Sequence, residues 1–236
     1  MFFFTYLHAC KVATTRQINR DVFKREYSTC YKRLRRYAKL KLITEIPTDQ
    51  TLDRSLAYSL TSKGMRVVTS NIKNLIDGKR FKSNSINHDL KLVNVRNKFL
   101  SLATVKGYTT ENQLQTYSSF NTEDDFSILR DMRVDAVIDI QDHGKPRLSL
   151  PIELEISVKS VSEYQKKIRE IYYHKTIKYL FYVCNNKESE RKIKKLELDF
   201  AKERTKKIFY ITYDDFLSSK ESVTFNNQDN QFFQLT

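Results

Sequence analysis

The stretch that decides the fold of the second part of this chain is residues 131–159, DMRVDAVIDIQDHGKPRLSLPIELEISVK. Its apolar residues alternate with polar or acidic ones in two runs: Val134, Ala136, Ile138 and Ile140, then Ile152, Leu154, Ile156 and Val158. An apolar period of two is typical of β-strands. The polar residues 142–145 between the two runs indicate a turn. The sequence therefore predicts a β-hairpin over this stretch.

Charged side chains alternate with the apolar ones on the second predicted strand. Glu153, Glu155 and Lys159 project from one face together with Ser157, and Asp135 on the first strand can face the same way. Carboxylates at such a place can bind a divalent metal ion, which activates water for attack on a phosphate. The alternative is a solvated face, because antiparallel hairpins often carry charges on the side that faces water.

The net charge of the chain is +14, with a pI near 9.6, which indicates an acidic polymer as partner. The charge is concentrated in residues 11–41, which hold eleven Lys and Arg against Asp21 and Glu26. An anionic membrane would also attract this segment, but the segment lacks the wide apolar face of an interfacial helix. We therefore expect nucleic acid as the partner and no membrane insertion.

The cellular setting follows from the start of the chain and from its cysteines. The opening residues MFFFTYLHAC lack the basic region that precedes the apolar run of a secretory signal, so we expect a buried helix there. The three cysteines, Cys10, Cys30 and Cys184, are odd in number and far apart, which argues against a disulfide framework or a zinc cluster. These features predict a cytoplasmic protein.

Residues 1–75 are predicted to form a winged-helix DNA-binding domain. The expected elements are a helix over 2–11, a second helix capped by Thr14 and Thr15, a third capped by Ser28 and Thr29, and two short strands over 42–46 and 56–60 that form the wing. The third helix would contact the major groove of double-stranded DNA. Its candidate DNA-binding residues are Lys32, Arg33, Arg35, Arg36 and Lys39. The alternative is a basic solvated helix on a winged helix that binds protein.

Residues 76–86 are polar and basic and are predicted to be a connector, followed by a second domain over 87–236. The expected elements there are a long helix near His88, the hairpin, a helix over 160–172, a strand over 177–184, a helix over 189–206 and a strand over 208–213. The strand over 177–184 is almost continuously apolar, which predicts burial on both faces of a mixed sheet. The whole chain is thus expected to have a mixed α/β (α+β) fold.

Three short motifs follow this winged helix in order: His88-Asp89-Leu90, Arg133-Val134-Asp135 and Glu153-Leu154-Glu155. The arrangement resembles the replication-relaxation family, and within it the MobC-type mobilisation relaxases. The second domain resembles the PD-(D/E)xK restriction-endonuclease-like nuclease fold. The resemblance implies that Asp135 and Glu153 bind Mg²⁺ or Mn²⁺, with Glu155 sharing the metal ion.

The sequence departs from the nuclease pattern at one position. The usual catalytic lysine lies two residues beyond the second acid, where this chain has Glu155. Lys159 is expected to take its place from the same strand face, and Lys166 or Lys167 on the next helix could also do so. His88, Tyr164 and Gln165 are possible lining of the site. The Tyr172-Tyr173-His174 run invites comparison with tyrosine relaxases, but with 14 tyrosines in the chain such a run is expected by chance, and Tyr172 fits the apolar face of its helix.

The function expected from the resemblance is that of a metal-dependent DNA endonuclease or nickase of a mobile element, a relaxase acting at a transfer origin in plasmid mobilisation. Its expected partners are double-stranded DNA at a transfer or replication origin, a second copy of the chain, or relaxosome proteins. Two alternatives remain. One is a non-catalytic replication or mobilisation accessory factor with a degenerate nuclease fold, and the other is a transcriptional regulator.

Overall fold

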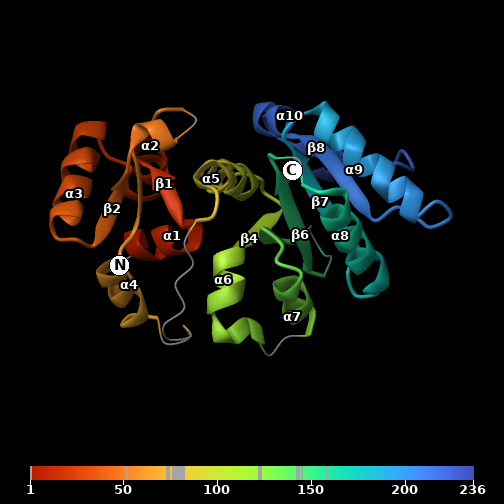
Figure 1. The fold of residues 1–236 in the computed structure, drawn as a ribbon, viewed down its shortest axis with the longest axis horizontal. Helices are drawn as coiled ribbons and strands as arrows, with labels where there is room; N and C mark the ends of the chain where they lie inside the picture. Colours follow the sequence, from red (N-terminus) through yellow and green to blue (C-terminus); the bar gives the residue numbers. More distant parts are fainter. Residues whose placement is uncertain are drawn as a thin grey trace. The chain divides into compact units, whose positions relative to one another are not determined.

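The computed structural model describes residues 2–51, 53–72, 75, 83–121, 124–141, 144, 146–157 and 159–236. The chain has a mixed α/β fold and forms two compact units (Figure 1). Unit 1 comprises Met1–Asn97 and Asn112–Thr122, and unit 2 comprises Lys98–Glu111 and Glu123–Thr236. The predicted connector falls mostly on residues 76–82, which lie outside the described residues.

Unit 1 combines helices with a three-stranded antiparallel sheet of order β1-β3-β2. Its elements up to α4 are α1 (Phe2–Cys10), β1 (Val12–Thr14), α2 (Thr15–Ile18), the π-helical turn η1 (Asn19–Phe23), α3 (Tyr27–Lys39), β2 (Ile43–Ile46), the 3-10 turn η2 (Thr48–Gln50), β3 (Ala57–Leu60) and α4 (Ser62–Thr69). It also contains most of α5 (Ile86–Leu100) and of α6 (Glu111–Thr116), and the 3-10 turn η3 (Ser118–Asn121). The three expected helices and the two short strands that were expected to form a wing are present in the expected order, and β1 is an additional strand.

Capping residues explain where the helices of unit 1 begin. Thr14 and Gln17 form a reciprocal capping box at the start of α2, as the sequence predicts for Thr14. The predicted cap of the third helix is wrong, because α3 already begins at Tyr27 and Ser28 lies within its first turn. At the start of α4 no side chain larger than hydrogen fits at Gly64, since a Cβ there would lie 2.0 Å from the carbonyl oxygen of Leu42.

Unit 2 contains a seven-stranded mixed sheet of order β10-β9-β8-β7-β6-β5-β4. Its elements after α5 are β4 (Val105–Thr110), α7 (Asp124–Asp131), β5 (Ala136–Ile140), β6 (Leu148–Glu155), α8 (Val161–Tyr173), β7 (Leu180–Cys184), α9 (Lys187–Phe200), β8 (Ile208–Thr212), α10 (Tyr213–Ser218), β9 (Val223–Asn226) and β10 (Phe232–Leu235). Strands β6, β7 and β8 are parallel, and the other neighbours are antiparallel. The predicted hairpin is confirmed as β5 and β6, and every residue of β7 is buried, as expected.

The register of the sheet assigns its side chains to two faces. Glu153 is the neighbour of Tyr182, and Tyr182 is the neighbour of Tyr210, so these three residues share one face. Residues on this face contact α8 and α9, since Lys167 of α8 contacts Glu153. The opposite face carries an aromatic core in which Phe181 lies 4.6 Å from Phe225 between ring centroids.

One sequence prediction about unit 2 is wrong in a way that affects the site. The second strand of the hairpin was expected to extend to Lys159, whereas β6 ends at Glu155. Lys159 therefore lies in the segment between β6 and α8 and not on a strand face. Strands β4, β9 and β10 and helices α7 and α10 are further elements that the sequence analysis does not predict.

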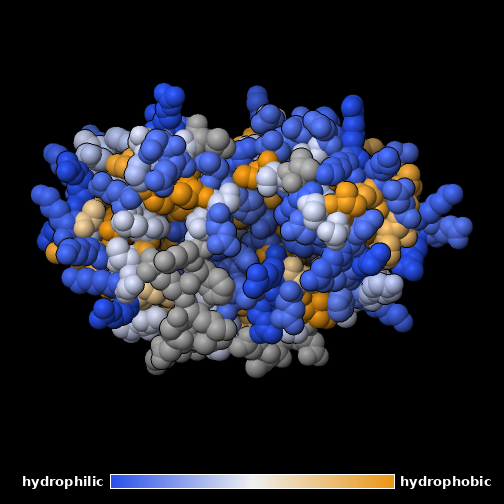
Figure 2. Space-filling model, viewed as in Figure 1, coloured by the Kyte–Doolittle hydropathy of each residue, from blue (hydrophilic) through white to orange (hydrophobic). Residues whose placement is uncertain are grey.

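Hydrophilic residues cover most of the surface visible in Figure 2. Among the described residues, no helix has both the length and the apolar character needed to cross a membrane.

Candidate active site

Two glutamates of β6 form the centre of the candidate site in unit 2. Glu153 and Glu155 are each 1% exposed, although both were expected on a polar face of the hairpin. Asp135 directly precedes β5, and its Oδ2 accepts a hydrogen bond of 2.7 Å from the backbone N–H of Leu154. The structure thus places the three predicted carboxylates beside one another at the ends of two paired strands.

Two lysines reach these glutamates from outside the sheet. The Nζ of Lys159 lies 3.3 Å from Oε2 of Glu155 and 3.9 Å from Oε2 of Glu153. The Nζ of Lys167, in α8, donates a hydrogen bond to Oε1 of Glu153. Lys166 instead points to Glu170 and is largely exposed. Of the two alternatives on α8, only Lys167 therefore belongs to the cluster.

The electrostatics of the cluster reflect its burial. Burial raises the pKa of Glu153, and the positive charge of Lys167 opposes this rise. Burial likewise raises the pKa of Glu155, against the effect of Lys159. For Lys159 burial favours the neutral form, but the carboxylates of Glu153 and Glu155 more than compensate and raise its pKa. The lysines thus oppose the effect of burial on the two glutamates without cancelling it, whereas the glutamates favour the charged form of Lys159.

Oxygen atoms for a metal ion are present, but a complete ligand set is not. Oε2 of Glu153 and Oε2 of Glu155 are buried, and from the described residues they have only the ion pairs with Lys159 and no hydrogen bond of good geometry. Such atoms are uncommon in proteins because an unpaired buried polar group costs free energy. Within the described part of the chain, however, no group of three His, Cys, Asp or Glu side chains is arranged to hold a metal ion. The two glutamates therefore fit a hard cation as partial ligands, with the remaining positions left to water.

Aromatic residues complete the surroundings of the glutamates. Tyr164 of α8 is buried, and its hydroxyl accepts a hydrogen bond of 3.2 Å from the backbone N–H of Lys159. Burial raises the pKa of Tyr164 to about 12, so its phenol is neutral at physiological pH. Tyr182 of β7, which the sequence analysis overlooks, is the strand neighbour of Glu153, and its buried hydroxyl has no partner among the described residues. The apolar run that contains Tyr182 does not alternate with polar residues, so the sequence carries no signal for the face on which Tyr182 lies.

The remaining predicted site residues lie elsewhere. Gln165 is exposed on α8. His88 belongs to unit 1, where its Nδ1 lies 3.4 Å from Oδ1 of Asp89, whereas the carboxylates belong to unit 2. Tyr172 donates a hydrogen bond of 2.6 Å to the buried carboxylate of Glu197. Tyr172 therefore has a structural role at this face of the sheet. Nothing among the described contacts of Tyr172 supports a role as a nucleophile.

The basic residues predicted to contact DNA lie on α3 in unit 1. Only Cys30 and Leu34 of this helix are buried, and the five predicted residues Lys32, Arg33, Arg35, Arg36 and Lys39 are all exposed. The guanidinium of Arg33 lies 4.9 Å from the ring centroid of Phe23, and that of Arg35 lies 5.9 Å from that of Tyr31. These cation–π contacts hold two of the arginines at the flanks of the exposed face.

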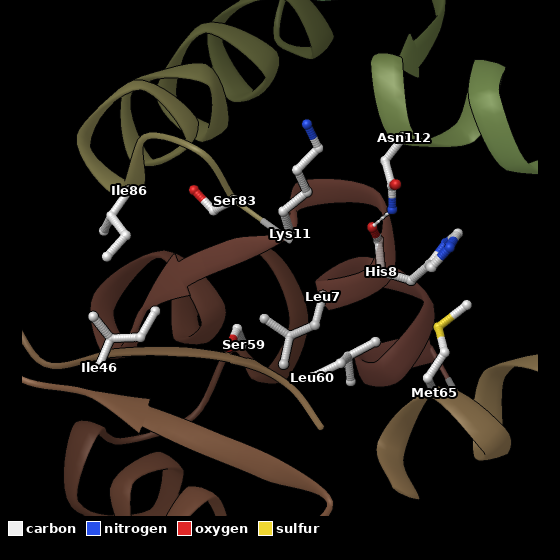
Figure 3. A pocket seen from close by; sticks show the side chains of 10 residues that line it. All are labelled: Leu7, His8, Lys11, Ile46, Ser59, Leu60, Met65, Ser83, Ile86 and Asn112. Carbon is white, nitrogen blue, oxygen red and sulfur yellow. Dashed lines mark hydrogen bonds between the residues drawn. The ribbon is translucent and has the colours of Figure 1, made fainter. Parts of the chain in front are cut away.

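Unit 1 also contains a cavity of about 310 Å³ that none of the predicted site residues lines (Figure 3). Leu7, Leu60 and Met65 contribute apolar side chains, and His8 and Asn112 contribute polar ones. The side-chain amide of Asn112 donates to the backbone oxygen of His8, as the dashed line in Figure 3 marks. Both ring nitrogens of His8 are buried and have no hydrogen-bond partner among the described residues.

This burial of His8 predicts that the first unit loses stability in acid. Burial lowers the pKa of His8 from 6.5 to about 4. His8 of the unfolded chain is therefore protonated below about pH 6.5, whereas His8 of the folded chain stays neutral down to about pH 4. This difference lowers the free energy of unfolding by about 3 kcal/mol between these two pH values. Stability rises again as the pH rises, because the neutral form is the one that is buried. We expect the difference in unfolding free energy between wild type and His8→Phe to change by this amount between pH 7.5 and pH 4; a constant difference would contradict the prediction.

Comparisons with known proteins give one match. A model of the replication-relaxation family matches residues 4–194, which span most of unit 1 and the candidate site with α8 and β7. Searches of curated proteins and of solved structures found no match. Because the family model covers well over half of the chain, the protein is a member of the replication-relaxation family.

Proposed function

We propose that this protein is a metal-dependent DNA endonuclease, a nickase that acts in the replication or mobilisation of a mobile element such as a plasmid. Family membership supports the role in replication or mobilisation. The observation that carries the catalytic part is the pair of buried glutamates, Glu153 and Glu155, beside Asp135 and two lysines. Buried acids are costly for stability, and strongly perturbed groups cluster at functional sites.

The order of elements in unit 2 supports a PD-(D/E)xK-like nuclease core. The antiparallel strands β4, β5 and β6 come first, and α8 then leads to β7, which pairs in parallel with β6. Asp135 directly before β5 and the glutamates at the end of β6 support this assignment, because the resemblance implies acidic residues on these two strands. The proposed catalytic domain is residues 87–236, after a winged helix over 1–75 and the connector 76–86.

Glu153 and Glu155 would be the direct ligands of a Mg²⁺ or Mn²⁺ ion, and Asp135 would bind the ion through one of its waters, because the three side chains are not arranged as one ligand set. Mg²⁺ needs only one or two protein carboxylates, because it keeps several waters. When bound, such an ion lowers the pKa of a water molecule and neutralises charge on the reacting phosphate. The chain's own contribution is to hold the carboxylates away from solvent and in register on neighbouring strands.

The two lysines would have different tasks. Lys159 faces both glutamates, and 38% of its side chain is exposed, so its ammonium can reach a bound phosphate and stabilise charge that develops there. Lys167 is 17% exposed and is hydrogen-bonded to Glu153, so it fixes that carboxylate. We therefore assign the role of the missing nuclease lysine to Lys159 and a positioning role to Lys167.

DNA would be recognised by unit 1. The order of α1, β1, α2, α3, β2 and β3 supports a winged helix in which α3 enters the major groove of double-stranded DNA. The exposed basic residues of α3 would supply the phosphate and base contacts. Binding of this unit would bring the DNA to the protein, and cutting would require unit 2.

The test is incubation of the wild-type protein with supercoiled plasmid that carries DNA from its own mobile element. With Mg²⁺ or Mn²⁺ we expect conversion to the open circular form, and with EDTA we expect none, because the carboxylates alone cannot activate water. Plasmid that stays supercoiled with either ion would refute the proposed activity.

A second candidate is a non-catalytic DNA-binding factor of replication or mobilisation. Both glutamates already have lysine partners, and Glu155 stands where the nuclease lysine is expected. This candidate predicts DNA binding without nicking and no heat of binding when Mn²⁺ is titrated into the protein.

A further inference from the structure

Lys192 of α9 lies beside the candidate site without having been assigned a role there. Its Nζ donates a hydrogen bond of 3.4 Å to the backbone oxygen of Lys159. The same ammonium lies 5.6 Å from the ring centroid of Tyr164. Because the hydroxyl of Tyr164 binds the backbone N–H of Lys159, both contacts of Lys192 tie it to the segment that carries the proposed catalytic lysine.

Lys192 has no ion pair with a described residue, in contrast to Lys187 and Lys194 of the same helix and to the two lysines of the site. On α9, Lys187 and Lys194 both pair with Glu190. In the site, Lys159 and Lys167 pair with the two glutamates. For Lys192, no carboxylate lies within ion-pair distance in the described ranges of the chain. Unlike Lys159 and Lys167, Lys192 can therefore accept an anion without breaking an ion pair with a described residue.

The present contacts of Lys192 are also weak enough to be exchanged. A distance of 3.4 Å is beyond the usual range of a good N–H···O hydrogen bond. A cation–π contact near the surface contributes little stabilisation. A hydrogen bond from an ammonium to a phosphate oxygen is charge-assisted and considerably stronger. A phosphate that approaches the site would therefore displace both contacts.

We propose that Lys192 is an anion subsite that binds a backbone phosphate of DNA next to the phosphate that a metal ion at Glu153 and Glu155 would hold. The inference rests on the proposed function, since it places DNA at the carboxylates. Its chemistry is that of a phosphodiester contact, which positions the strand without reading its sequence. Lys192 would act in this way as a positioning residue, because it touches the substrate away from the bond that is cut.

The test measures DNA affinity against salt concentration in EDTA, by fluorescence anisotropy with duplex DNA and the full chain. We expect Lys192→Gln to weaken binding and to reduce the slope of log K against log salt by about 0.9, the value for one lost phosphate contact on duplex DNA. Lys192→Arg should restore the wild-type slope. Lys195→Gln is the matched control, because Lys195 is exposed one turn further along the same helix.

A slope for Lys192→Gln equal to that of wild type would overturn the proposal. So would equal reductions in Lys192→Gln and Lys195→Gln, since these would reflect the net charge of the helix alone. The measurement contains no divalent ion and does not depend on cutting. A wild-type protein that fails to nick plasmid would thus refute the proposed activity and leave the result for Lys192 standing.

Discussion

Asp135→Asn and Glu153→Gln are each expected to abolish nicking of supercoiled plasmid while leaving DNA affinity unchanged or higher. Each change removes a negative charge that would bind the metal ion and that also repels the phosphates of DNA. The measurement is the rate of open-circle formation with Mg²⁺ or Mn²⁺, with binding followed separately in EDTA. Full nicking by both variants would show that these carboxylates are structural.

Variants of the two lysines separate their proposed roles. We expect Lys159→Ala to lower the nicking rate on the order of a hundredfold, comparable to the loss of one preorganised transition-state donor. We expect Lys167→Met to lower stability by about 3 kcal/mol, because it leaves the buried carboxylate of Glu153 without its partner. Adding Glu153→Gln to Lys167→Met should recover part of that stability.

Lys166→Ala is the matched control for these variants, since Lys166 lies next to Lys167 on α8 but is exposed and pairs with Glu170. It should nick and unfold like wild type. If Lys159→Ala nicks at the wild-type rate while Lys167→Met is folded and inactive, Lys167 is the catalytic lysine instead.

The second large effect is expected on α3. Replacing Arg33, Arg35 and Arg36 together by Ala should weaken DNA binding steeply and reduce the slope of log K against log salt by about 3, roughly one unit for each lost phosphate contact. The three residues are exposed, so the fold should survive, which circular dichroism can verify.

The control for this triple variant carries the same change in net charge on unit 2. Arg169, Lys175 and Lys178 are exposed, and their replacement by Ala should change the slope much less. Equal slopes in wild type and the α3 variant would remove α3 from the DNA interface.

The sequence alone predicts the parts of the fold that depend on local periodicity. The alternation at Ala136, Ile138, Ile152 and Leu154 predicts the hairpin, and the apolar run that ends at Cys184 predicts a strand buried on both faces. The limits of such local signals show at the ends of elements. Strands of three or four residues such as β1 and β10 are too short to carry a period, and the start of α3 is not set by the Ser-Thr pair expected to cap it.

Which charged groups meet was decided only by the tertiary structure. The sequence identifies Asp135, Glu153 and Glu155 as one set, because strand alternation places them on one face. It leaves three lysines as alternatives, and it does not decide whether the acids form a metal site or a solvated strand face. Their burial depends on the parallel pairing of β6 with β7.

The choice between Lys166 and Lys167 depends on the rotation of α8 about its axis. That rotation is fixed by the burial of Tyr164, Ile168 and Ile171, which turns Lys167 toward Glu153 and Lys166 toward solvent. The location of Lys192 beside Tyr164 depends in turn on how α9 packs against α8. Contacts between residues so far apart in the chain arise from packing, which no local pattern of residue types encodes.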